Sequence, residues 1–158
     1  MDPYGLGGPV SWAGPDRAPN WFRIAREFTE RWHHQQHIRE AVATPGYMEA
    51  RYLKPVLDTF MRALPHTYRN IEAREDTIID VTISGNSGDQ WLLVRERHTW
   101  SLYLGSVAHA NAAVAIPQEI AWKLFTKWIT KEEALKESEI LGDSSLALKM
   151  FDMTAVIA

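Results

Sequence analysis

A glutamate and three histidines lie close together in residues 30–40, ERWHHQQHIRE. Glu30 and His34 are four positions apart, so on an α-helix they are neighbours and can contact one cation together. A carboxylate oxygen and an imidazole nitrogen are both ligands that zinc accepts, but a catalytic zinc takes three protein ligands and a water. The pair therefore predicts part of a metal site. The alternative interpretation is a solvated polar helix face that contains several histidines.

The helix that must position this pair is predicted over residues 20–42, which contain no Gly or Pro, with Asn20 as its N-cap. Three aromatic residues fall within about 20° of one another on the helix and predict its packing stripe, Trp21, Phe28 and Trp32. Glu30, His34 and His37 then fall at about 180°, 220° and 160° from Trp21, on the opposite face. We expect the candidate ligands to face away from the core.

The rest of the chain predicts an α+β fold. Residues 1–19 contain four Gly and four Pro and predict an irregular arm anchored by Trp12. Residues 47–70 predict a second helix that Pro65 ends or kinks. After this helix the apolar residues alternate with polar ones, as they do in strands, and residues 90–98 and 100–105 predict a hairpin. Together these patterns predict an N-terminal helical segment, then a small antiparallel sheet of about four strands packed with helices. The remaining strands are expected at 77–85 and 111–117, and the later helices at 117–130 and 143–158.

Composition excludes several classes of protein. The net charge is −3 without a basic block, which disfavours nucleic-acid binding, and no apolar run reaches the roughly 20 residues of a membrane span. The chain has no cysteine, which excludes disulfides, thiolate metal ligands and a cysteine nucleophile. The N-terminus has neither the basic nor the apolar region of a secretory signal. A cytoplasmic protein is expected.

The run IAREFTERWHHQQHIREAV resembles the last bundle helix of the DinB-like, mycothiol-dependent maleylpyruvate isomerase family. Glu30, His34 and the pair Ile38-Arg39 match that helix in place, whereas His37 stands where the family commonly has Asp. Three later runs are similar to the family's C-terminal domain, which resembles sterol carrier protein 2: QWLLVRERHTWSLYLG, AAVAIPQEIAWKLFTKWIT and ILGDSSLALKMFDMTAVIA. The resemblance implies a helical remnant in residues 1–45 and a sterol-carrier-2-like domain in 46–158.

The resemblance also implies zinc, held by Glu30 and His34, and mycothiol as a thiol cofactor. In the family, a histidine from an early bundle helix is the third ligand, and those early helices are absent from this chain. Another chain supplies that ligand, or His37 substitutes for it, or no competent site forms. Arg95 or Arg97 on the predicted hairpin is the candidate for holding a carboxylated substrate. An active form would be an isomerase or thiol transferase completed from outside the chain.

Three functions follow as hypotheses. The first is a truncated or split member of this zinc- and mycothiol-dependent family, associated with a chain that supplies the bundle. The second is a non-enzymatic, sterol-carrier-like module that binds an apolar small molecule or lipid. The third is a structural fragment in which two copies pair over an uncovered helix face. For the second hypothesis, five aromatic residues either line an apolar tunnel or fill an ordinary core: Trp91, Trp100, Trp122, Phe125 and Trp128.

Overall fold

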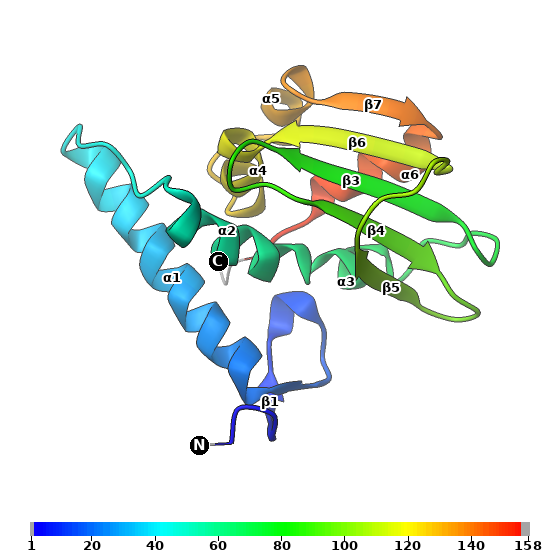
Figure 1. The fold of residues 1–158 in the computed structure, drawn as a ribbon, viewed down its shortest axis with the longest axis horizontal. Coiled ribbons are helices and arrows are strands. Elements are labelled where there is room, and N and C mark those ends of the chain that lie inside the picture. Colours follow the sequence, from blue (N-terminus) through cyan, green and yellow to red (C-terminus); the bar gives the residue numbers. More distant parts are fainter. Residues whose placement is uncertain (1, 156–158) are drawn as a thin grey trace.

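The computed structural model describes residues 2–155 and contains a five-stranded sheet with helices packed against one face (Figure 1). The strand order is β5-β4-β3-β6-β7. The α+β class is confirmed, but the sheet has one more strand than expected and is not wholly antiparallel, because β3 and β6 run in parallel. The strands are β3 (Ile78–Ser84), β4 (Gln90–Arg95), β5 (Trp100–Leu104), β6 (Ala112–Pro117) and β7 (Glu139–Gly142).

The parallel pair has a local cause. The predicted hairpin of β4 and β5 forms on one side of β3. Residues 105–111 then bring the chain back to the end of the sheet where β3 begins. There Asn111 exchanges two hydrogen bonds with Ile78, each 2.8 Å long: its backbone N–H donates to the Ile78 carbonyl, and its side-chain oxygen accepts from the Ile78 N–H. β6 therefore starts beside the start of β3 and runs in the same direction.

The N-terminal arm is more regular than predicted, because two short strands pair before the first helix. The predicted anchor is confirmed: Trp12 is 8% exposed and packs edge-to-face on Phe22, with ring centroids 5.6 Å apart. Asn20 is the first helical residue and not the N-cap, which is Pro19. Its side-chain amide instead donates to the Asp2 carbonyl at 2.9 Å. These elements are β1 (Leu6–Pro9), a 3-10 turn (Ser11–Ala13), β2 (Arg17–Pro19) and α1 (Asn20–Ala41).

The predicted second helix is two helices, α2 (Ala50–Met61) and α3 (Leu64–Tyr68). Pro65 lies in the first turn of α3, so the predicted break near this residue is confirmed. The buried Tyr68 hydroxyl donates to the Leu146 carbonyl at 2.6 Å, which ties α3 to the C-terminal part of the chain.

Four short helical segments complete the fold: α4 (Gln118–Phe125), α5 (Lys131–Lys136), α6 (Ser144–Lys149) and a 3-10 turn (Met150–Asp152). α4 ends before the predicted Thr130, because the chain adopts a positive φ of 60° at Lys127. α6 begins close to the predicted position, and Asp143 is its N-cap, since its carboxylate accepts hydrogen bonds from two N–H groups in the first turn. The last predicted helix is shorter than expected, and its residues 156–158 lie outside the described part.

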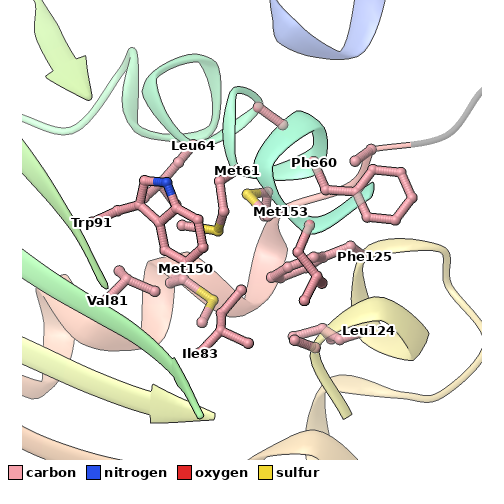
Figure 2. Close-up of a cluster of buried hydrophobic side chains, with 14 of the residues drawn as sticks. Phe60, Met61, Leu64, Val81, Ile83, Trp91, Leu124, Phe125, Met150 and Met153 are labelled. Carbon is pink, nitrogen blue, oxygen red and sulfur yellow. The ribbon is translucent and has the colours of Figure 1, made fainter. Parts of the chain in front are cut away.

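One cluster of buried side chains fills the space between the sheet and the helices (Figure 2). Methionines from α2 and from the C-terminal segment meet aliphatic residues of β3 and aromatic residues of α2 and α4 there. The cluster includes Trp12, Phe22 and Trp32, so the arm and α1 share it with the sheet. The division at residue 45 stays a prediction. Within residues 2–155, no helix is both long enough and apolar enough to span a membrane. The residues labelled in Figure 2 are Phe60, Met61, Leu64, Val81, Ile83, Trp91, Leu124, Phe125, Met150 and Met153.

Candidate functional site

The helix that carries the histidines buries a different face from the one predicted. Its buried residues are Phe22, Thr29, Trp32, His33 and Gln36. At 100° per residue, the centre of this face lies about 80° from the predicted stripe. Phe28, a member of that stripe, is 40% exposed. Trp32 is buried and Trp21 packs against the core, so the prediction is confirmed for these two residues and wrong for Phe28. The centre of the face was missed because three of the buried positions are polar, and hydrophobicity alone does not select them.

Glu30 and His34 lie on one flank of α1, between its buried and outer faces. His34 is exposed. Glu30 is half-buried, and its Oε1 is buried without a hydrogen-bond partner among the described residues. Across residues 2–155, no group of three or more His, Asp or Glu side chains is arranged to hold a metal ion. The described residues thus form no complete ligand set around Glu30 and His34, and the role of this pair as metal ligands stays a prediction.

His33 and His37, for which the sequence predicted no definite role, join α1 to the segment that follows α4. The His37 ring lies 4.2 Å from that of His33 and 4.2 Å from that of Trp128, measured between centroids. Trp122 then contacts both Trp128, at 5.6 Å, and Trp32 of α1, at 5.3 Å. These rings meet edge-to-face or at a tilt, and together they are the main aromatic contact between α1 and the region of α4.

Burial determines the charge of His33. It lowers the pKa of His33 from 6.5 to about 4, and the neighbouring His37 and His34 lower it further by repulsion. The Nε2 atom of His33 is buried and has no hydrogen-bond partner within residues 2–155. His33 is therefore a neutral packing residue at neutral pH.

The predicted substrate-binding arginines lie elsewhere. Arg95 ends β4, is only 8% exposed, and approaches Glu72 at 3.7 Å and the Trp100 ring at 5.7 Å. Arg97 lies beyond the strand and is exposed, so the two arginines do not share one strand face. The end of β4 lies across the molecule from α1 (Figure 1). The structure therefore does not bring Arg95 together with Glu30 and His34.

A groove of about 380 Å³ lies between α2 and the edge of the sheet. We call it the β5 groove. In the β4–β5 ladder, Trp91 pairs with Leu104 and Leu93 pairs with Leu102, so these four side chains share the face that the helices cover. α3 packs against the start of β5, where Tyr68 contacts Trp100, but the described helices leave the end of this strand uncovered, and Leu104 is 67% exposed. The groove is lined by Lys54, Asp58, Arg62, Pro65, Asp89, Trp91, Leu102, Tyr103 and Leu104.

The wall of the β5 groove on α2 carries the charges. The Lys54 Nζ donates to the Asp89 carboxylate at 2.6 Å and lies 3.6 Å from Asp58, and the hydrogen bond to Asp89 raises the pKa of Lys54. Arg62 stacks over Trp21 at 4.6 Å and forms no ion pair or side-chain hydrogen bond among the described residues. Burial lowers the pKa of Arg62, although its guanidinium stays charged. Arg62 is thus the cation available to a ligand.

A second hollow, of about 480 Å³, separates the C-terminal part of α1 from α4. We call it the α1–α4 cleft. It is lined by Gln36, Glu40, Met48, Trp122 and Lys123, among other residues. Two of its N–H donors, Gln36 Nε2 and Trp122 Nε1, are buried without a partner. Its acids and its lysine give it a mixed charge.

The five aromatic residues proposed to line a tunnel have different environments. Trp100 and Phe125 are buried in the core, at 5% and 0% exposure. Trp91 backs the β5 groove and Trp122 lines the α1–α4 cleft. Trp128 is half-buried and stacks on His37. Trp91 and Trp122 are each only 4% exposed and belong to the core cluster as well. The core interpretation therefore holds for four of the five residues, and Trp128 packs against the cluster from its border.

Sequence reasoning missed the lining of the β5 groove. Leu102 and Leu104 alternate as in any half-buried strand, and only the position of α2 leaves them uncovered. A usable signal was the spacing of Lys54, Asp58 and Arg62, which places three charges on one face of α2.

No family model matches the chain, and no curated protein matches it. Solved structures match at low identity. Sterol carrier protein 2 like 2 from Aedes aegypti is 19% identical, with 61% of this chain and 94% of that chain covered and a TM-score of 0.47. The palmitated form of SCP2L2 from the same mosquito is 20% identical, covering 60% and 90%, with a TM-score of 0.48.

The sterol carrier protein domain 2 of Helicoverpa armigera is 16% identical, covering 63% and 84%, with a TM-score of 0.46. These three proteins are named as sterol carrier proteins. With TM-scores below 0.5 and identities of 20% or less, they assign no ligand to this chain. Membership of the DinB-like family stays a prediction.

Proposed function

We propose that this chain is a binding module for small amphipathic molecules. The apolar part of the ligand lies on Leu102, Leu104 and Trp91 in the β5 groove, and an anionic head group contacts Arg62. One observation carries this proposal. The helices leave Leu104 at the edge of the sheet uncovered, and Arg62, which forms no ion pair among the described residues, lines the same groove. No reacting side chain is required, so the function is binding and not catalysis.

The apolar contact supplies the affinity in this proposal. A groove of about 380 Å³ is within the range of small-molecule sites. Covering an exposed leucine side chain contributes about 1 to 2 kcal/mol. Leu104 is mostly exposed and Leu102 partly so. A straight hydrocarbon chain fits a floor that consists of two neighbouring strands.

The head-group contact supplies the selectivity. A guanidinium donates two parallel hydrogen bonds to a carboxylate, an arrangement that an ammonium does not reproduce. Lys54 is already held by Asp89 and Asp58, whereas Arg62 is not. The preferred ligand is therefore a long-chain carboxylate and not the corresponding alcohol.

The core behind the groove is adaptable. The Trp91 indole points toward Met61, Leu64 and Met150 (Figure 2). Methionine side chains are unbranched and repack easily around a new neighbour. A shift of Trp91 would let the groove deepen toward the core and accept longer chains.

Titration with a fluorescent fatty acid tests the proposal. We expect saturable binding with a Kd on the order of 1 µM. Arg62→Gln should weaken it by about tenfold, because one charge-assisted contact is lost. Arg51→Gln is the matched control on the same helix, since Arg51 is exposed, pairs with Glu49 and does not line the groove. Absence of binding, or equal losses in both variants, would reject the proposal.

A second proposal follows from the DinB-like resemblance: zinc at Glu30 and His34, with mycothiol as a thiol cofactor. The buried, unpartnered Glu30 Oε1 favours it. Two ligands fall short of a zinc site, so a third must come from outside the described residues, and we assign no catalytic step. Zinc analysis of protein purified without chelator should find one zinc per chain, lost in Glu30→Ala and His34→Ala. Metal-free wild-type protein would rule this out.

A further inference from the structure

α1 carries a second apolar face, on its solvent side. Six residues follow one another at alternating spacings of four and three, the repeat by which helices pair side by side. The apolar members are among the most exposed large side chains of the protein: Ile24 at 59%, Phe28 at 40%, Ile38 at 57% and Val42 at 64%. We call this face the outer stripe; it consists of Ile24, Phe28, Arg31, Gln35, Ile38 and Val42.

The outer stripe has no partner among residues 2–155. At 100° per residue, its centre lies about 135° from the centre of the buried face of α1. α1 lies at the edge of the molecule, and its outer side faces away from every other labelled element (Figure 1). A helix that needed only its own core would carry polar residues on this side.

The size of the outer stripe suits a weak but specific interface. Large side chains at these exposures present about 100 Å² each, or about 400 Å² for the four. Two copies facing each other would cover about 800 Å², and flanking residues extend this to the roughly 1,000 Å² of a biological interface.

We propose that the outer stripe pairs with the same stripe of a second copy, antiparallel to it. Only in the antiparallel direction does each apolar residue of the stripe face an apolar residue of the partner without placing two arginines together. Ile24 then meets the partner's Val42, Phe28 meets the partner's Ile38, and Arg31 meets the partner's Gln35. A parallel pair would instead place Arg31 against the partner's Arg31, and like charges in a helix seam are destabilising.

A hollow beside Ile24 fits this arrangement. It has a volume of about 170 Å³ and is lined by Asn20, Arg23, Ile24, Arg26 and Glu27. The antiparallel register brings the partner's Val42 to this point. The two-fold axis repeats the contact at the other end of the stripe, as in any isologous interface.

Sedimentation velocity over a concentration series tests the pairing. We expect a monomer–dimer equilibrium in the wild type and at least tenfold weaker association in Ile38→Asp. Leu141→Asp is the control, because Leu141 is 70% exposed on β7 and not on α1. Circular dichroism should show that both variants fold. Wild-type protein that stays monomeric throughout, or a dimer that only Leu141→Asp weakens, would overturn the proposal.

Cross-linking tests the direction. The chain has no cysteine, so every disulfide that forms must join two introduced cysteines. We mix Ile24→Cys protein with Val42→Cys protein and oxidise. An antiparallel pair yields mainly disulfides between the two variants. Disulfides within each variant alone would overturn the antiparallel register. The outcome is independent of ligand binding in the β5 groove, which lies on α2 and the sheet.

Discussion

Trp91→Ala is expected to destabilise the protein by about 3 to 4 kcal/mol, the largest effect we predict for a single substitution. Trp91 is 4% exposed and separates the β5 groove from the core. Removing the indole leaves a cavity against Met61, Leu64 and Met150, which α2, α3 and the C-terminal segment hold in place. Urea unfolding monitored by circular dichroism measures the loss.

Two controls make this result specific. Trp91→Phe keeps an aromatic ring on β4 and should cost less than half as much. A saturating fatty acid should recover part of the stability lost in Trp91→Ala, because a ligand that binds only the folded state stabilises it. A loss below 1 kcal/mol in Trp91→Ala would mean that Trp91 is not packed against the core.

Acidification from pH 6.5 to pH 4 is expected to remove about 2 to 3 kcal/mol of stability through His33 alone. Burial lowers the pKa of His33 from 6.5 to about 4. Within this range the unfolded chain binds a proton at this histidine and the folded chain does not. The stabilisation is therefore fully present above pH 6.5 and is lost as the pH falls through the folded-state value.

His33→Phe isolates this contribution. Phenylalanine can pack against His37 and Trp128 but cannot titrate. We expect the free energy of unfolding to fall less steeply with acid in this variant than in the wild type. His98→Gln is the control, because His98 is exposed in the turn between β4 and β5. Parallel pH profiles for the wild type and His33→Phe would contradict the assignment.

The central strands could be predicted because their apolar residues alternate in the sequence and the fold buries those same residues. In β6, alternate residues are buried as the sequence alternation requires. β7 was missed because only Ile140 of its four residues is even half-buried, so no alternation marks it. The parallel pairing of β3 with β6 depends on where residues 105–111 return, which no local pattern encodes.

The position of Glu30 and His34 on one turn of α1 could be predicted from spacing alone. Which face of α1 is buried could not, because two apolar stripes compete on this helix. One contains Phe22 and Trp32, and the other contains Ile24 and Ile38. The packing of Trp122 against Trp32 and of Trp128 against His33 selects the first, and these two tryptophans lie about 90 positions later in the sequence.

The most direct test of the proposed function is to map where a fatty acid with a photoreactive group in its tail attaches to the wild-type protein. The account predicts labelling of β5 and the facing side of α2, at or near Leu102, Leu104 and Trp91, and competition by unlabelled fatty acid. Labelling concentrated in the α1–α4 cleft, around Met48 and Trp122, or labelling that excess fatty acid does not reduce, would contradict it.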